Sequence, residues 1–143
     1  MKTDHVIALT ARVRDRAYEF IIRELNEKAV TGLAPSHGGI MSALFDRDRA
    51  SMKELSGKIG RDKSTVTALV SKLVRAGYAV KEKDGMDHRL TYLRLTAEGR
   101  ALERDFNDIS EKLIATAFRG FSRRERESMV KALGKMLSNF EKE

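Results

Sequence analysis

Residues 4–30 set the strongest limit on how this chain folds, because they include neither glycine nor proline. Their apolar side chains recur at three-, four- and seven-residue intervals, as one face of an amphipathic helix requires. These are Val6, Leu9, Val13, Phe20, Ile21 and Leu25, with Ile7, Tyr18 and Ile22 broadening the stripe. A helix of about 26 residues is about 39 Å long, more than a compact domain of this size covers. The stripe therefore predicts a second chain packed against it, most simply in a homodimer.

The rest of the chain reads as further helices interrupted by one hairpin. Pro35 opens a short helix, Ser51 with Glu54 fits a capping box, and Gly77 is a typical helix stop. The expected helices are 35–46, 51–59 and 62–76, followed by strands 78–83 and 90–95, a helix from Thr96 to Ala117 and a last helix from Ser122 to Phe140. The apolar stripes at 102–118 and 129–140 also require a second chain.

The positive charge is concentrated in the middle of the chain. The net charge is +7, and residues 47–100 hold thirteen basic and seven acidic groups. Residues 1–46 are balanced, and residues 101–143 have a net charge of +1. A basic middle between nearly neutral ends is typical of a surface that meets a polyanion, most often nucleic acid.

Two short helices joined by a tight turn within 51–76, followed by a hairpin, predict a winged helix-turn-helix. The expected fold class is mainly α with a small β-hairpin wing and long N- and C-terminal dimerisation helices. We expect 1–143 to form a single domain. Within it, 34–96 is the expected winged helix-turn-helix DNA-binding lobe, and 1–33 with 97–143 the helical dimerisation lobe.

The helix at 62–76 has two different faces. At about 100° per residue, Val66, Leu69, Val70, Leu73 and Val74 share one face. The opposite face is small, hydroxyl-rich and basic, a composition that suits the major groove of DNA. It could equally be the solvated back of an ordinary amphipathic helix, although the absence of glutamate favours DNA. The candidate contacts in and before this helix are Ser51, Lys63, Ser64, Thr65, Thr67, Ala68, Ser71, Lys72 and Arg75.

The hairpin tip offers a second contact. Arg89 follows Asp87 by two residues, so on an extended segment both side chains share a side. A carboxylate there holds the guanidinium extended, which reduces the side-chain entropy lost on binding. Such an arginine suits the narrow minor groove of A·T-rich DNA. The alternative is an exposed ion pair of little energetic value.

The run from Ser51 to Thr96 resembles the MarR family of bacterial winged-helix regulators. The residues that carry the resemblance are Leu55-Ser56-Gly57-Lys58-Ile59-Gly60, Ser64-Thr65-Val66-Thr67, Leu69-Val70-Ser71-Lys72-Leu73, Gly77-Tyr78, Asp87-His88-Arg89 and Leu93-Arg94-Leu95-Thr96. The resemblance implies a dimer on an inverted repeat, with Arg89 in the minor groove, Asp87 orienting it, and Ser64, Thr65, Thr67 and Lys72 touching bases or phosphates. It departs at Ala68, where the family often has a long polar residue; Ala68 offers a thymine methyl contact instead.

The resemblance also implies a small aromatic or phenolic effector. The candidate wall residues are Tyr18, Ile22, His37, Met41 and Phe45, for each of which ordinary core packing is the alternative. A dimer without any effector stays open as well. With no cysteine in the chain, the thiol-oxidation switch of some relatives is excluded.

Other chemistry has little support in the sequence. The three histidines lie on separate segments without ligand spacing, so no metal site is expected. No nucleophile elbow or glycine-rich phosphate loop occurs, and we expect neither an enzyme nor a bound cofactor. No apolar run reaches the roughly 20 residues of a membrane span, and residues 1–16 lack a secretory signal pattern. We therefore expect a cytoplasmic protein without a membrane partner.

The sequence thus predicts a homodimeric, sequence-specific DNA-binding transcriptional regulator, more simply a repressor than an activator, that binds a pseudo-palindromic operator in double-stranded DNA. A winged-helix adaptor that meets an acidic protein and binds DNA without sequence preference is the alternative. Selectivity among DNA sequences discriminates the two.

Overall fold

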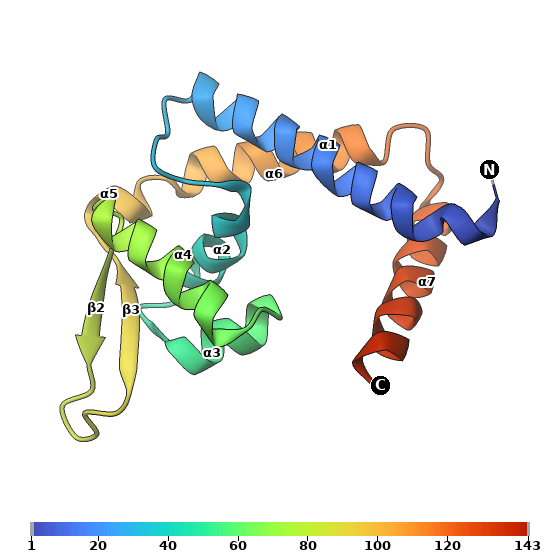
Figure 1. Cartoon of the computed structure of the whole chain (residues 1–143). Helices are drawn as coiled ribbons and strands as arrows, with labels where there is room; N and C mark the ends of the chain where they lie inside the picture. Colours follow the sequence, from blue (N-terminus) through green and yellow to red (C-terminus); the bar gives the residue numbers. More distant parts are fainter. Residues whose placement is uncertain (1, 143) are drawn as a thin grey trace. The chain divides into compact units, whose positions relative to one another are not determined.

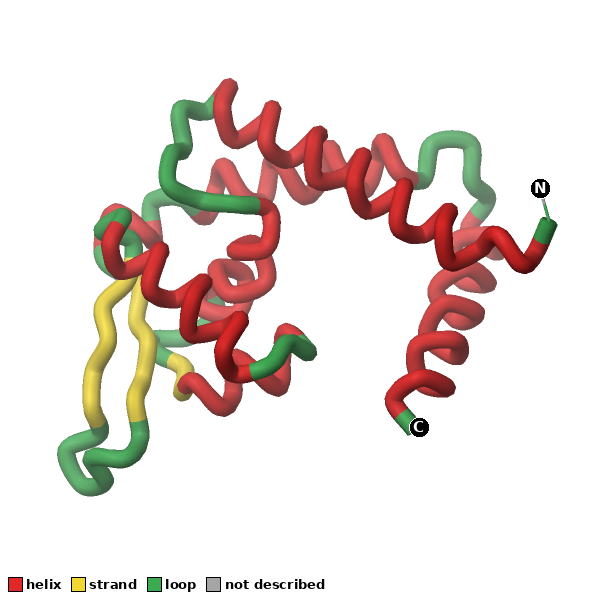
Figure 2. The backbone as a smooth tube through the Cα atoms, viewed as in Figure 1, coloured by secondary structure: helices red, strands yellow, loops and turns green. Residues whose placement is uncertain are grey.

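A computed structural model describes residues 2–142, which are mainly helical with one small antiparallel sheet (Figures 1 and 2). This confirms the expected fold class. The chain divides into two compact units, Met1–Ser110 and Glu111–Glu143, which are described separately below. None of the helices within 2–142 is long and apolar enough to cross a membrane.

The first unit holds the sheet and most of the helices. Its elements are a 3-10 turn at Thr3–His5, α1 (Val6–Glu27), a 3-10 turn at Pro35–His37, α2 (Gly38–Phe45), β1 (Ala50–Ser51), α3 (Met52–Ile59), α4 (Lys63–Arg75), β2 (Ala79–Lys83), β3 (Thr91–Leu95), α5 (Ala97–Arg100) and the start of α6 (Glu103–Ala117). The second unit holds the end of α6 and α7 (Arg123–Glu141).

Two expected helices differ from the structure. α1 ends at Glu27 rather than near Val30, because Ala29 adopts a positive φ of 57° and the amide of Val30 bonds back to the Leu25 carbonyl at 3.0 Å. The single long helix expected from Thr96 is two helices, α5 and α6. The amide of Leu102 bonds to the Gly99 carbonyl at 3.2 Å, a tight turn that directs the Leu102 side chain toward the core.

The sheet has the strand order β1-β3-β2, and all its pairs are antiparallel. β2 and β3 form the expected hairpin, with Ala79 opposite Leu95 and Lys83 opposite Thr91. β1 was not expected: its two residues pair Ala50 with Leu93 on the open edge of β3. This pairing joins the start of α3 to the hairpin and so places the helix-turn-helix beside the wing.

The main core lies between α2, α3, α4 and the sheet. α2 supplies four buried residues and α4 three. The whole cluster is Ile40, Met41, Ala43, Leu44, Ala50, Leu55, Val66, Val70, Leu73, Ala79, Leu93 and Leu95. Burying one large aliphatic side chain contributes about 1.5–3 kcal/mol of transfer free energy to folding. This cluster is therefore the principal stabilising feature of the unit.

A second, smaller cluster fixes the end of α1. Leu25, Val30 and Ile109 are buried together. Beside them the Lys28 ammonium, on a side chain only 20% exposed, lies 3.7 Å from an Asp105 carboxylate oxygen and 3.4 Å from one of Asp108. Apolar packing and this ion cluster together hold α1 against the first part of α6.

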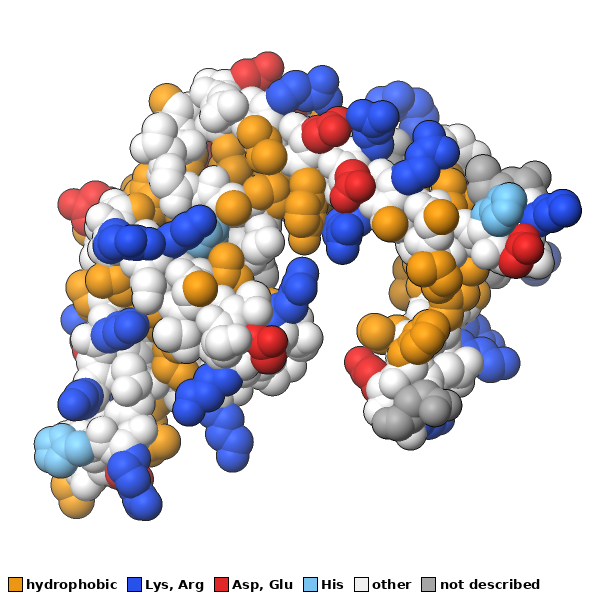
Figure 3. Space-filling view, in the orientation of Figure 1, with side chains coloured by type: hydrophobic (Ala, Val, Ile, Leu, Met, Phe, Trp, Pro, Cys, Tyr) orange, Lys and Arg blue, Asp and Glu red, His pale blue; other side chains and the backbone are white. Residues whose placement is uncertain are grey.

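In the second unit, no residue of α7 is buried. The helix begins with the expected capping box: the Glu125 amide bonds to Ser122 Oγ, and the Ser122 amide bonds to the Glu125 carboxylate. Its exposed apolar residues are Met129, Val130, Leu133, Leu137 and Phe140. The space-filling view shows apolar side chains gathered along α7 (Figure 3).

Candidate nucleic-acid interface

α4 presents the polar face that its sequence predicts. Val66, Val70 and Leu73 are buried in the core, which turns the opposite side of the helix outward. On that side Thr65 and Ser71 are half-buried, and the exposed residues are Lys63, Ser64, Thr67, Ala68, Lys72 and Arg75. The structure thus brings the predicted helix residues onto one accessible surface.

At the start of α4, the hydroxyl groups of Ser64 and Thr67 both donate their protons to acceptors within the chain. The Asp62 carboxylate caps the helix by accepting the Thr65 amide at 2.7 Å, and it also accepts the Ser64 hydroxyl at 3.1 Å. Hydrogen bonds from Thr65 and Ser64 hold the pKa of Asp62 below its usual range. The Thr67 hydroxyl donates to the Lys63 carbonyl at 2.8 Å. Because both hydroxyl protons are used within the chain, Ser64 and Thr67 offer lone pairs to an outside donor.

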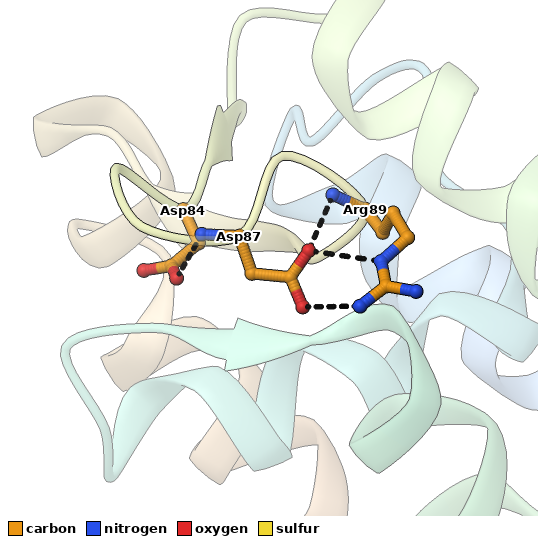
Figure 4. Close-up of polar contacts among 3 residues, drawn as sticks. All are labelled: Asp84, Asp87 and Arg89. Atoms are coloured by element: carbon orange, nitrogen blue, oxygen red, sulfur yellow. Dashed lines mark hydrogen bonds and ion pairs between the residues drawn. The ribbon is translucent and has the colours of Figure 1, made fainter.

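Asp87 and Arg89 are paired at the hairpin tip, as predicted (Figure 4). The expected extended segment is wrong: residues 88 and 89 lie in a turn, in which the Leu90 amide bonds to the Asp87 carbonyl at 3.0 Å. Asp87 Oδ1 accepts the Arg89 amide at 3.0 Å and Arg89 Nε at 3.2 Å. The Arg89 side chain holds the pKa of Asp87 below its usual range, so the carboxylate stays ionised. Asp84 in turn accepts the Asp87 amide at 3.0 Å. The guanidinium is thereby oriented while 91% of the Arg89 side chain stays exposed.

A groove of about 450 Å³ lies between the start of α3, the start of α4 and the wing. It brings three cations together, Lys53, Lys63 and Arg89, and its other lining residues are Ser51, Met52, Ser56, Leu90 and Thr91. Lys53 and Ser56 were not among the predicted site residues. They join the groove because β1 pairs with β3 and so brings the first turns of α3 to the wing, a contact between distant segments that the sequence did not show.

Ser51 lies in this groove, but its hydroxyl is engaged inside the chain. The residue is 8% exposed. Its Oγ accepts the Glu54 amide at 3.1 Å and donates to the Glu54 carboxylate at 3.2 Å, and Glu54 also pairs with Arg47 at 2.6 Å. Ser51 therefore caps α3, and its contact with DNA remains a prediction.

Basic side chains predominate around the helix-turn-helix and the wing on the face in view (Figure 3). Two basic side chains of this lobe are fixed by neighbours: the Arg49 guanidinium lies 3.8 Å from the centre of the Tyr92 ring, and Arg94 pairs with Glu82 at 2.6 Å. Among residues 2–142, no group of three His, Asp or Glu side chains is arranged to hold a metal ion. The arrangement offers cations and hydroxyl acceptors, which are the groups that bind phosphates and base edges.

The five candidate effector-wall residues lie in different settings. Met41 and His37 are fully buried, and Phe45 packs edge-on against Phe106 with ring centres 5.8 Å apart. On α1, Tyr18 is half-buried and Ile22 is 46% exposed. Core packing accounts for Met41 and Phe45, while an effector contact for these five residues remains a prediction.

His37 predicts a pH dependence of stability. Burial lowers its pKa from the ordinary 6.5, and the charge of Lys72 acts in the same direction. The unfolded chain then takes up a proton near pH 6.5 that the folded chain does not, so stability is full above pH 6.5 and falls as the pH drops through the folded-state pKa. We expect the free energy of unfolding, measured by urea titration between pH 7.5 and 5, to fall in this way. His37→Gln should show a flatter profile, and an equal slope in both proteins would contradict the assignment.

Comparison with known proteins agrees with this geometry. A family model described as MarR family matches residues 31–90. YkoM of Bacillus subtilis, described as an uncharacterized HTH-type transcriptional regulator, is 28% identical over 125 residues, which cover 87% of this chain and 79% of that protein. Among solved structures, Bordetella bronchiseptica BpsR, whose DNA binding is regulated by 6-hydroxynicotinic acid, has a TM-score of 0.79 at 23% identity over 94% of this chain and 92% of that one. The Streptomyces coelicolor transcriptional regulator PcaV, solved with its natural ligand, has a TM-score of 0.79 at 21% identity over 91% and 89% of the two chains.

Proposed function

Because this chain belongs to the MarR family of winged-helix transcriptional regulators, we propose that it is a homodimeric repressor that binds a pseudo-palindromic operator. One observation carries the proposal: the outward face of α4 and the oriented Arg89 lie on either side of a groove lined by Lys53 and Lys63. Two copies of α4 would enter successive major grooves about one helical turn apart. Two copies of Arg89 would reach the flanking minor grooves.

The homodimer is supported by apolar surface that the single chain leaves uncovered. On α1, Ile7 and Val13 are 55% and 61% exposed; on α7, Val130 and Phe140 are 64% and 67% exposed. α7 has 19 residues and none of them is buried, so packing within the single chain adds little to the stability of this helix. A second copy of the chain is the simplest partner for such surfaces, because in a symmetric dimer the same apolar patch of each copy packs against the other. The proposed dimerisation lobe is accordingly 1–33 with 97–143.

A small aromatic effector that changes operator affinity is the second element of the proposal. Its support is the similarity to BpsR, regulated by 6-hydroxynicotinic acid, and to ligand-bound PcaV. Both proteins have the same fold as this chain, and each one responds to or binds a small molecule. The five wall residues predicted from the sequence are the positions to substitute first. Thermal denaturation with and without hydroxylated aromatic acids tests this element, and a shift in Tm would support it.

The experiment that tests the function is selection of binding sites from a random duplex library at about 150 mM salt. We expect enrichment of an inverted repeat with half-site centres about ten base pairs apart. If no motif is enriched and binding disappears as salt rises, only counterion-driven affinity is present. That outcome would contradict an operator-binding regulator and favour the adaptor interpretation.

Arg89→Ala should weaken operator binding by at least about fivefold, since an arginine that reads a groove contributes about 1–3 kcal/mol per contact. The thermal unfolding midpoint should not change, because the side chain is 91% exposed. Arg89→Lys is the matched variant, because it keeps the charge but loses the guanidinium group that Asp87 orients. Its operator affinity should lie between those of the wild type and of Arg89→Ala. Affinity measured by fluorescence anisotropy that is equal for all three proteins would contradict the wing assignment.

Lys72→Ala should reduce the salt dependence of binding. If Lys72 neutralises one phosphate in each half-site, the slope of log Kd against log salt should fall by about one unit per chain. Arg16→Ala removes the same charge from the exposed surface of α1 and serves as the control. An unaltered slope for Lys72→Ala would show that Lys72 makes no phosphate contact.

A further inference from the structure

The loop between α1 and α2 is attached at three points to α4 and the residues that follow it. The Tyr78 hydroxyl, just beyond α4, donates to the Thr31 carbonyl at 3.3 Å. At Gly32 an added Cβ would lie 3.3 Å from the Cβ of Ala76, so the loop backbone approaches α4 closely there. At the end of the loop, His37 Nε2 lies 3.1 Å from the Leu69 carbonyl in the middle of α4. We call residues 31–37 the strap; it consists of the second half of the loop drawn between α1 and α2 in Figure 2 and the 3-10 turn at Pro35–His37.

His37 is the polar centre of the strap. Its side chain is fully buried, and Nδ1 accepts the Ala34 amide at 2.9 Å. Nδ1 therefore carries no hydrogen, which assigns the hydrogen to Nε2 and makes Nε2 the donor to the Leu69 carbonyl. Burial lowers the pKa of the ring, so the neutral tautomer that makes both bonds is the one present at neutral pH. One side chain thus joins the strap backbone to the α4 backbone.

The position of this bond matters because it is a directional contact to the middle of α4 from another segment of the chain. Val66, Val70 and Leu73 hold the helix to the core by apolar packing, and the attraction that this packing supplies is non-directional. A hydrogen bond to the Leu69 carbonyl fixes both the rotation and the height of the helix. Leu69 adjoins Ala68 on the outward face, where a groove contact needs placement within about 0.5 Å.

We propose that His37 is a positioning residue that sets α4 relative to α1 through the strap. This inference rests on the proposed function, in which α1 takes part in the dimer and α4 reads DNA. The spacing of the two α4 helices would then depend on the path from α1 through the strap to Leu69. His37 touches no DNA in this role and acts only through the α4 backbone.

Two substitutions separate the two bonds of the ring. In His37→Gln the amide nitrogen reaches the place of Nε2 and keeps a donor for Leu69. In His37→Asn the oxygen reaches only the place of Nδ1 and keeps an acceptor for Ala34 while the bond to α4 is lost. The Asn variant is thus the test, and the Gln variant the rescue.

Amide hydrogen exchange of the full chain without DNA is the first measurement. We expect exchange in residues 63–75 to be about fivefold faster in His37→Asn, the effect of one lost buried hydrogen bond, and near wild type in His37→Gln. Exchange in β2 and β3 should not change in either variant. Faster exchange throughout the first unit, or equal exchange rates in the two variants, would overturn the inference. His37 would then stabilise the core by packing alone.

Spacing discrimination is the second measurement. The wild type and both variants are compared on the selected operator and on the same repeat with one base pair inserted between its halves. His37→Asn should lower the ratio of the two affinities about fivefold while leaving the salt slope unchanged, and His37→Gln should restore it. An unchanged ratio in His37→Asn would overturn the positioning role. A wild type without operator preference would overturn the proposed function instead, and the exchange result would still decide the role of His37.

Discussion

Placing two carboxylates on the apolar face of α7, by Val130→Asp with Leu137→Asp, should convert the protein to a monomer and abolish tight operator binding. Both residues lie on one side of the helix and are 64% and 59% exposed in the single chain. In the proposed dimer they would be buried, and an unpaired carboxylate in an apolar interface costs several kcal/mol. A dimer gains about 10²–10⁴ in affinity from linking two half-site contacts, and a monomer loses that gain.

Lys135→Asp is the matched control. It changes the net charge of each chain by the same amount as the double substitution, but on the opposite side of α7, where the residue is exposed. We expect it to remain dimeric in analytical ultracentrifugation and to bind the operator at most a few-fold more weakly. Circular dichroism should show both variants folded. A double variant that stays dimeric with wild-type affinity would contradict the proposed interface.

The sequence predicted the elements that have strong local signals. α4 could be placed because Val66, Val70 and Leu73 recur at helical spacing between an Asp62 cap and Gly77. The pairing of Asp87 with Arg89 was predicted from their two-residue spacing, although the two residues meet in a turn and not on the extended segment that was expected. In each case the determining interaction spans only a few residues, so periodicity and capping rules are sufficient.

Features that depend on contacts between distant segments could not be predicted. β1 has only two residues, too few for any alternating pattern, and it exists because Ala50 meets Leu93 on an unpaired edge. The bond from His37 to Leu69 joins residues 32 apart, and the sequence offered His37 only as a possible effector contact. Lys53 and Ser56 join the groove because α3 and the wing meet through β1.

The division of the helix expected from Thr96 has the same origin. The Thr96 hydroxyl accepts the Gly99 amide at 3.1 Å and donates to the Gly77 carbonyl at 2.7 Å, and the Thr96 amide bonds to the Tyr78 carbonyl at 3.0 Å. These bonds press the first turn of α5 onto the segment that follows α4. Only a residue without a side chain fits at the point of closest approach, and that residue is Gly99.

Gly99→Ala should therefore destabilise the first unit strongly. A Cβ there would meet the Tyr78 carbonyl oxygen at far less than van der Waals distance, and the obstacle is backbone rather than a movable side chain. Relief requires α5 to move away, which breaks the bonds from Thr96 to Gly77 and Tyr78. We expect a loss of about 3 kcal/mol in the free energy of unfolding, at the upper end for overpacking. Urea denaturation followed by circular dichroism measures it.

Gly57→Ala is the control that separates space from backbone propensity. Gly57 lies inside α3 with no atom within 4 Å of an added Cβ, so alanine there should stabilise the chain by about 0.5–1 kcal/mol. Opposite signs for the same substitution would locate the effect of Gly99 in its contact with Tyr78. If Gly99→Ala were as well tolerated as Gly57→Ala, α5 would not be pressed against the Tyr78 carbonyl, and the close approach of the two segments would not be what requires glycine at position 99.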